Sequence, residues 1–195
     1  MSKPRSRQSS RARRRSTRQR TAIIIGVAAV AVVALTGAVL AVRATGRDAA
    51  DRIHLYQGET TLGGANVNLS ALVGKGEPVV VNFWASNCPP CRMEMPGFQH
   101  VYAEHGGKGY LMLGVDVGPQ TGLGTHEGAR ALLQQEDIAY PVGYAEGNGL
   151  VVAYGLRGMP TTLFFDASGH QVGRVVGYLP EPQLRTRLAS LLATN

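Results

Sequence analysis

The chain has 195 residues, 44% of them hydrophobic, which suits one globular domain with an appendage. Its formal net charge of +7 is unevenly distributed: residues 1–47 hold eleven basic and no acidic side chains, whereas residues 48–195 hold nine basic and thirteen acidic ones. The globular part is therefore mildly acidic, which excludes the nucleic-acid-binding function that the overall charge suggests.

The N-terminal segment is typical of a membrane anchor. Residues 1–20 carry nine basic side chains, and residues 22–42 follow without a charged one. As a helix, this apolar run spans the roughly 30 Å hydrocarbon core of a bilayer. We predict a basic cytoplasmic tail at residues 1–20, a transmembrane helix in contact with lipid at 21–42, a linker at 43–51 and an extracytoplasmic domain at 52–195.

A cleaved signal peptide is the alternative interpretation of this segment. The apolar region of a signal peptide usually has about 7 to 15 residues, and the best small-x-small cleavage sequence is the weak Val42-Arg43-Ala44. The length of the apolar run therefore favours an uncleaved, single-pass anchor in the cytoplasmic membrane.

The globular part alternates between strand-like and helix-like patterns. In chain order these are the strands of an N-terminal β-hairpin at 52–56 and 66–69, a buried strand at 78–84, a helix from about residue 88 to 105, a buried strand at 109–115, a helix at 126–136, a strand at 140–144, a short helix at 149–154, strands at 161–166 and 171–176, and a helix at 181–192. This βαβ then ββα order, with an inserted αβ element, predicts an α/β fold with a mixed central sheet and helices on both faces.

Glycine, proline and threonine mark the boundaries of these elements. The hairpin should turn around Gly63-Gly64, and Gly106-Gly107 should end the first long helix, which Pro96 should kink. Residues 118–128 are rich in glycine and are interpreted as a flexible loop, after which Thr125 should cap the next helix.

The two cysteines of the chain form the motif Cys88-Pro89-Pro90-Cys91, directly after a buried strand and at the start of a helix. A thiolate is the attacking species in disulfide exchange, and the unpaired amides and dipole at a helix N-terminus lower the pKa of a cysteine placed there. We therefore expect a redox-active disulfide in which Cys88 is the nucleophile and the less exposed Cys91 attacks back to release the partner.

The two prolines predict the redox character of this pair. Pro89 and Pro90 have no N–H, so that chiefly the amides of Cys91 and Arg92 remain to stabilise the Cys88 thiolate. A less stabilised thiolate makes a less oxidising couple. The reduction potential should therefore lie nearer the roughly −270 mV of thioredoxin than the roughly −120 mV of DsbA.

Three motifs together resemble the TlpA/ResA-like, membrane-anchored branch of the thioredoxin-fold (redoxin) family. They are Phe83-Trp84-Ala85, the Cys-Pro-Pro-Cys sequence itself, and Gly-Met-Pro-Thr-Thr at 158–162. The resemblance covers roughly residues 53–192 and implies a thioredoxin-like fold, a thiol-disulfide oxidoreductase activity without a cofactor, and a cis peptide bond before Pro160, which should lie against the cysteines.

Two residues depart from the patterns of this fold family. Asn87 stands where a tryptophan commonly precedes the first cysteine, which should weaken apolar docking of a partner. Asn82 stands where thioredoxins carry a buried aspartate that accepts a proton from the second cysteine. Because an amide cannot accept that proton, water or another carboxylate must do so.

Four further residues are candidates for supporting the active site, besides Pro89 and Pro90. Glu94 belongs to the RxExP signature of the resemblance, although a solvated helix carboxylate is the favoured interpretation of this side chain. Trp84 should lie half in the core and half in the active-site wall, and Pro160 should flank the sulfurs. Met159 should lie near the sulfurs too, although packing alone also explains a methionine there.

The resemblance implies a reductant of extracytoplasmic protein disulfides. Its clients would be proteins with disulfides or CxxC thiols, such as apocytochrome c during cytochrome c maturation, and a membrane thiol transporter would supply its electrons. The alternative is a copper(I) chaperone for respiratory oxidase assembly that uses Cys88, Cys91 and Met159 as soft ligands, although no histidine is evident as a third ligand.

Other cysteine chemistries fit the sequence poorly. Residue 92 is arginine rather than the histidine of a haem-attachment motif, and two cysteines without an adjacent histidine pair cannot supply the roughly four ligands of a zinc site. A peroxidase signature of the form PxxxTxxC is missing. We therefore predict no metal and no cofactor.

Overall fold

The computed structural model describes residues 34, 51–57, 62, 64–105 and 108–193. The predicted tail, anchor and linker, except for Asp51 and residue 34, lie outside these residues, as do Gly63, Gly106 and Gly107. Among the described residues, no helix is both long and apolar enough to cross a membrane. The chain divides into two units between Arg47 and Asp48, and the fold described below belongs to the second.

The described strands form one seven-stranded sheet in the order β2-β1-β5-β4-β3-β6-β7. The strands are β1 (Arg52–Leu55), β2 (Asn66–Asn68), β3 (Val79–Trp84), β4 (Leu111–Asp116), β5 (Val142–Ala145), β6 (Thr161–Phe165) and β7 (Gln171–Val176). The three central strands β3, β4 and β5 are parallel, and the outer strands pair antiparallel. The sheet is mixed, as the order of elements predicts.

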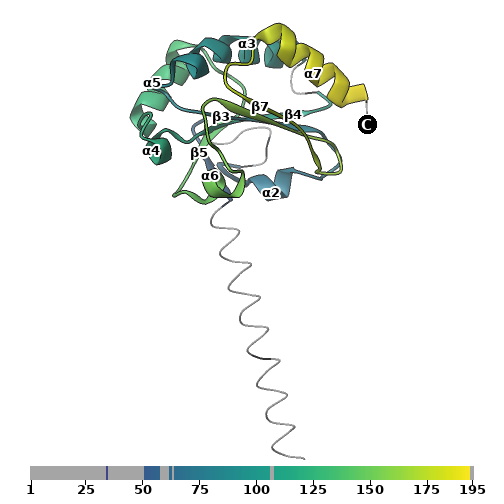
Figure 1. Ribbon diagram of the computed structural model, residues 1–195, viewed down its shortest axis with the longest axis horizontal. Coiled ribbons are helices and arrows are strands. Elements are labelled where there is room, and N and C mark those ends of the chain that lie inside the picture. Colours follow the sequence, from purple (N-terminus) through teal and green to yellow (C-terminus); the bar gives the residue numbers. More distant parts are fainter. Residues whose placement is uncertain (1–33, 35–50, 58–61, 63, 106–107, 194–195) are drawn as a thin grey trace, which may run out of the picture. The chain divides into compact units, whose positions relative to one another are not determined.

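Helices cover both faces of the sheet (Figure 1). They are α2 (Leu69–Leu72), α3 (Pro89–His105), α4 (Gly118–Thr121), α5 (His126–Gln135), α6 (Gly149–Ala153) and α7 (Glu181–Ala193). The apolar side chains of α3, α5 and α7 share one core with one face of the sheet, whereas those of α2 and α6 share a second core with the other face. This is the layering of a thioredoxin-like α/β fold.

The central strand β3 is buried along its whole length because it faces both cores. Val80 and Trp84 point into the core with α3, whereas Val79, Val81 and Phe83 point into the opposite core. Strand alternation places Asn82 on the same face as Val80 and Trp84, under α3. A polar side chain thus stands in the middle of an apolar layer.

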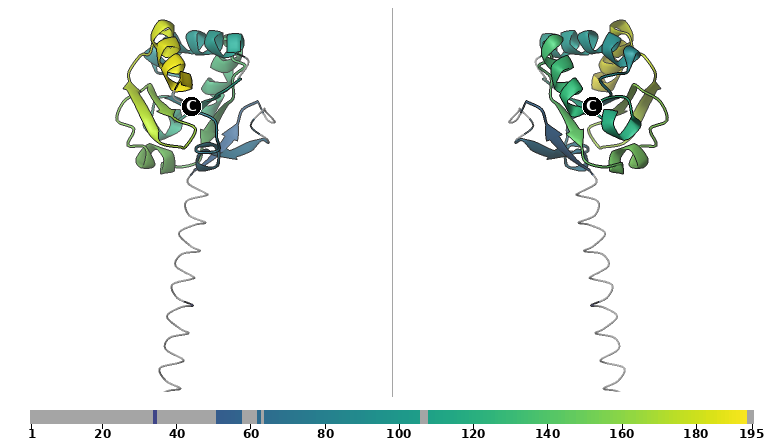
Figure 2. Two further views of the ribbon diagram at one scale, coloured as in Figure 1. Left: turned by 90° about the vertical axis from the view of Figure 1, so that its right-hand side faces the viewer. Right: turned by 90° about the vertical axis from the view of Figure 1, so that its left-hand side faces the viewer.

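The N-terminal hairpin extends the sheet at the β5 edge. β1 pairs antiparallel with β2 and also with β5. Both views of Figure 2 show the blue hairpin at the edge opposite the yellow-green strand β7. The sequence predicts the hairpin, but the strand that it joins follows only from the fold.

The predicted starts of two strands are wrong because the backbone there does not yet have the regular hydrogen-bonded pairing of the sheet. The strand predicted from residue 109 begins at Leu111, since Gly109 has a positive φ of 80°. The strand predicted from residue 140 begins at Val142, because Pro141 has no N–H to donate. The first long helix runs from Pro89 to His105 with Pro96 inside it.

Two short helices replace predicted irregular or extended segments. The strand predicted at 66–69 ends at Asn68, and α2 begins at Leu69, whose side chain is fully buried against the sheet. The predicted flexible loop at 118–128 contains α4. Thr125 caps α5 as predicted, since its hydroxyl accepts a hydrogen bond from the Gly128 amide at 3.1 Å.

Candidate active site

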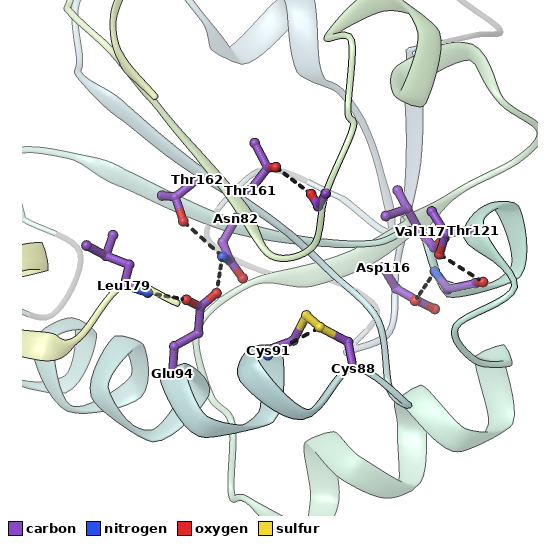
Figure 3. The surroundings of a disulfide bond; sticks show 12 residues. Asn82, Cys88, Cys91, Glu94, Asp116, Val117, Thr121, Thr161, Thr162 and Leu179 are labelled. Carbon is purple, nitrogen blue, oxygen red and sulfur yellow. Dashed lines mark hydrogen bonds between the residues drawn. A yellow bond between two sulfur atoms is a disulfide. The ribbon is translucent and has the colours of Figure 1, made fainter. Parts of the chain in front are cut away.

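The cysteine pair lies at the turn from β3 into α3 (Figure 3). Cys88 immediately precedes the helix, and its carbonyl accepts the first helical hydrogen bond from the Arg92 amide at 3.2 Å. Cys88 and Cys91 are joined by a disulfide. Cys88 retains 4% of its exposed surface and Cys91 none, so that the residue predicted as nucleophile is the more accessible one.

One amide reaches the sulfur of Cys88. The Cys91 N–H donates to Cys88 Sγ at 3.3 Å. Pro89 and Pro90 contribute no N–H, as predicted, but the Arg92 amide is engaged by the Cys88 carbonyl rather than by the sulfur. The helix N-terminus therefore offers this sulfur fewer donors than the sequence indicates.

Glu94 is buried, so the prediction of a solvated carboxylate is wrong. Its exposed fraction is 2%, and its side chain points from α3 toward Asn82 on β3 (Figure 3). Oε1 accepts from Asn82 Nδ2 at 2.7 Å, and Oε2 accepts from the Leu179 amide at 2.9 Å. Burial raises the pKa of Glu94 to about 7, although these two hydrogen bonds act to lower it.

Glu94 supplies the carboxylate that Asn82 cannot. Asn82 lies directly below the helix and is 1% exposed. Glu94 follows Cys91 by three residues, about one helical turn, and turns toward the same interior (Figure 3). With a pKa of about 7, this group can take up and release a proton near neutral pH.

The second motif reaches the same end of the sheet. The Met159–Pro160 peptide bond is cis, as the resemblance implies. Thr161 pairs with Phe83, so that Pro160 comes beside the end of β3 that leads to the cysteines. Met159 is partly buried and packs against the core cluster that contains both cysteines.

Trp84 differs from its predicted place. Its side chain is fully buried, with no exposed surface, and it belongs to the core that also contains Cys88 and Cys91. It therefore packs behind the cysteine pair instead of forming a partly exposed wall.

The inserted segment after β4 forms part of this site, which the sequence does not reveal. The Asn87 amide donates to the Leu123 carbonyl at 2.7 Å. A Cβ on Gly124 would overlap the Ser86 hydroxyl oxygen, so that only glycine permits this close approach. The density of glycines at 118–128 is the signal that could have indicated a tightly packed loop.

A second buried carboxylate lies at the end of β4. Asp116 is fully buried; Oδ1 accepts from the Gly118 amide at 2.8 Å, and Oδ2 accepts from the Tyr56 hydroxyl at 2.7 Å. His126 Nδ1 lies 3.3 Å from Oδ2. Burial, together with the hydrogen bond to Asp116, raises the pKa of Tyr56. This cluster joins the residue after β1 to β4 and α5.

The described residues contain no group of three or more histidine, cysteine, aspartate or glutamate side chains that could hold a metal ion. The arrangement supports thiol chemistry, with a slightly exposed cysteine, a fully buried cysteine and a carboxylate one helical turn away whose pKa is about 7.

Comparison with known proteins agrees with this chemistry. The sequence pattern of the AhpC/TSA family matches residues 47–171. The thiol-disulfide oxidoreductase ResA of Bacillus cereus is 29% identical over 132 residues, which cover 68% of this chain and 72% of that protein. ResA of Oceanobacillus iheyensis is 34% identical over 122 residues, which cover 63% of this chain and 60% of that protein.

Solved structures show the same likeness. The exposed lipoprotein thioredoxin of Streptococcus pneumoniae strain TIGR4 superposes with a TM-score of 0.57 and 27% identity, covering 66% of this chain and 93% of that one. A thioredoxin-family thiol:disulfide interchange protein of Chlorobium tepidum TLS superposes with a TM-score of 0.55 and 27% identity, covering 69% and 91%.

Proposed function

This chain is a thiol-disulfide oxidoreductase of the AhpC/TSA family, and we propose that it works outside the cytoplasm as a membrane-anchored reductant of protein disulfides. The observation that carries this proposal is the site itself. A slightly exposed cysteine and a fully buried one are joined at a helix N-terminus, and a buried carboxylate with a pKa of about 7 lies one turn further along the helix.

The reaction follows from the order of exposure. In the reduced protein the Cys88 thiolate attacks one sulfur of a client disulfide; a bond forms between Cys88 and the client, and the other client sulfur leaves as a thiolate. Cys91 then loses its proton and attacks Cys88 Sγ. The mixed disulfide breaks, the client is released with both thiols reduced, and two electrons have passed from the cysteine pair to the client.

Glu94 takes up the proton that Cys91 loses in the second step. Cys91 has no exposed surface, so bulk water cannot reach its thiol directly. An ionised Glu94 is the acid–base group on the same helix that turns toward the interior. Because its pKa lies near 7, it is substantially ionised at neutral pH and can pass the proton on afterwards.

The reducing direction is supported by the few donors around Cys88. Within the described residues, one amide donates to its sulfur, and neither proline can add another. An unstabilised thiolate gives the cysteine pair a stronger tendency to transfer its electrons. Equilibration of the full chain with glutathione tests this point: we expect a potential near the roughly −270 mV of thioredoxin, and a value near −120 mV would reverse the proposed direction.

The extracytoplasmic location is supported by the 21-residue uncharged run and the excess of basic residues before it. A reductant on that side of the membrane needs a steady electron source, because its cysteine pair is spent after one client. We propose a membrane thiol transporter as donor and proteins with disulfides or CxxC thiols as clients, among them apocytochrome c in cytochrome c maturation.

Trapping the client tests the function directly. The full-length Cys91→Ala variant, expressed in cells, should stall as a mixed disulfide through Cys88, so that covalent adducts appear on non-reducing gels and their partners can be identified by mass spectrometry. Cys88→Ala is the matched control and should give no adducts. An absence of adducts for Cys91→Ala, while the wild type reduces insulin, would count against a protein client.

A further inference from the structure

In the described part of the chain, the side-chain amide of Asn82 forms hydrogen bonds through its nitrogen but not through its oxygen. Nδ2 donates to Glu94 Oε1 at 2.7 Å and lies 3.1 Å from Thr162 Oγ1, to which it also donates. Oδ1 is buried and has no hydrogen-bond partner among the described residues. Buried polar atoms in folded proteins nearly always have partners, so an acceptor left idle beside a carboxylate calls for an explanation.

The present orientation of the amide suits an ionised Glu94. A carboxylate can only accept hydrogen bonds, and both Glu94 oxygens receive one, from Asn82 Nδ2 and from the Leu179 amide. A protonated Glu94 has different needs, because its O–H requires an acceptor. The Leu179 amide cannot accept, and Nδ2 of Asn82 cannot either.

Rotation of the amide resolves this difficulty. If the Asn82 side chain turns over about its terminal torsion, Oδ1 takes the place of Nδ2 and can accept from the Glu94 O–H. Thr162 permits the exchange, because a hydroxyl can accept from Nδ2 in one state and donate to Oδ1 in the other. Thr162 pairs with Asn82 in the register between β3 and β6, which keeps the two side chains adjacent.

We propose that Asn82 is a positioning residue whose amide turns over when Glu94 takes up the Cys91 proton, so that one neutral side chain serves both protonation states of Glu94. This inference rests on the proposed function, in which Glu94 accepts that proton. It also gives a reason for asparagine at this position: an aspartate would place two buried carboxylates in contact, which would then share one proton.

Within the part of the chain that the structure describes, Asn82 is the side chain that forms a hydrogen bond with Glu94. From α3 comes Glu94 itself, from β3 Asn82, and from the segment before α7 the Leu179 amide. Tyr140 is the titratable group that feels the Glu94 charge, since that charge adds to burial in raising the pKa of Tyr140. Among the described residues, no cation or second carboxylate contributes to the pKa of Glu94.

Nuclear magnetic resonance of the oxidised full-length chain in detergent tests the rotation without any mutation. With labelled asparagine and glutamate, the Glu94 carboxyl carbon reports ionisation between about pH 5 and about pH 9. Above the midpoint, the Asn82 NH₂ protons should show contacts to Thr162 and Glu94; below it, these contacts should disappear with the same midpoint. Contacts that persist while Glu94 titrates would overturn the proposal.

Glu94→Gln is the control for this measurement. A glutamine has no proton to exchange in this range, so that the Asn82 NH₂ contacts should then be independent of pH. A pH-dependent change that survives in Glu94→Gln would show that another group drives it and would overturn the proposal.

A matched pair of variants tests the consequence for the reaction. Threonine at position 82 can donate and accept, whereas valine has the same shape and can do neither. In Asn82→Val, the rate at which Cys91 resolves a mixed disulfide should fall by about tenfold. In Asn82→Thr, this rate should return to near that of the wild type. The rate of the initial attack by Cys88 should be unchanged in both variants. Equal loss in both variants would overturn the proposal, whereas a wild-type chain without disulfide reductase activity would refute the proposed function alone.

Discussion

Glu94 links the stability of the domain to pH at the scale of a single residue. Its pKa is raised from 4.5 to about 7 because burial disfavours the charged form. The folded state therefore binds a proton more tightly than the unfolded chain, so that the contribution of this group is fully present below about pH 4.5 and is lost as the pH rises through about 7.

Replacing Glu94 with glutamine should remove this dependence. Between about pH 4.5 and about pH 8 the wild type should lose about 3 kcal/mol of unfolding free energy relative to Glu94→Gln, because the pKa of Glu94 is raised from 4.5 to about 7 on folding. Urea denaturation of both proteins across this range measures the difference. Parallel curves for the two proteins would show that Glu94 is not the group responsible.

The hydroxyl groups of Tyr140, which is buried, and Tyr56, which is partly buried, make a second contrast between residues. In the part of the chain that the structure describes, the buried Tyr140 hydroxyl has no hydrogen-bond partner, whereas the Tyr56 hydroxyl donates to the buried Asp116 at 2.7 Å. Tyr140→Phe should leave the unfolding free energy unchanged or raise it by about 1 kcal/mol, since it removes an unsatisfied group, whereas Tyr56→Phe should lower it by about 2 kcal/mol. A larger loss in Tyr140→Phe, measured by urea denaturation, would contradict this assignment.

At the scale of elements, the segment after β4 holds the turn that carries Cys88. Gly124 lies against Ser86, where a Cβ would overlap the Ser86 hydroxyl oxygen. Gly122 in the same segment has a positive φ of 70° but nothing within 4 Å of its Cβ position. Substituting each glycine therefore distinguishes the effect of a steric overlap, at Gly124, from the effect of backbone conformation, at Gly122, on stability and activity.

Gly124→Ala should lower both stability and disulfide reductase activity. The added methyl group must displace Ser86 and with it the active-site turn, at about 1 to 3 kcal/mol for overpacking in addition to backbone strain. Gly122→Ala carries only the strain of a left-handed residue, about 1 kcal/mol, and should retain full activity. The measurements are thermal unfolding and insulin reduction; equal activity of the two variants would exclude this contact from positioning the turn.

The long elements could be predicted because their patterns are repeated over many residues. The run that forms β3 is apolar on both faces. Thr125 has a hydroxyl that can cap the first turn of α5. The short helices α2 and α4 have four residues each, too few for a periodic pattern. They form because the sheet and the active-site turn bury one side of them.

At the scale of the whole molecule, the uncharged run at residues 22–42 should anchor the chain. The full-length protein should remain in the membrane fraction after an alkaline wash, whereas a variant without residues 1–47 should be released. Protease added to intact spheroplasts should digest the domain of the full-length protein. Release of the full-length chain by the wash would favour a cleaved signal peptide instead.

The sequence by itself determined the cysteine chemistry and the mixed sheet, because these depend on a motif of fixed form and on the order of strand-like and helix-like segments, while the cis bond before Pro160 is expected from the family resemblance of its motif. Only the tertiary structure decided the environment of Glu94. Its partners are Asn82 on strand β3 and the Leu179 amide, which lies 85 residues further along the chain. A sequence pattern records which side chains are present, but a pKa depends on which distant groups replace water around them.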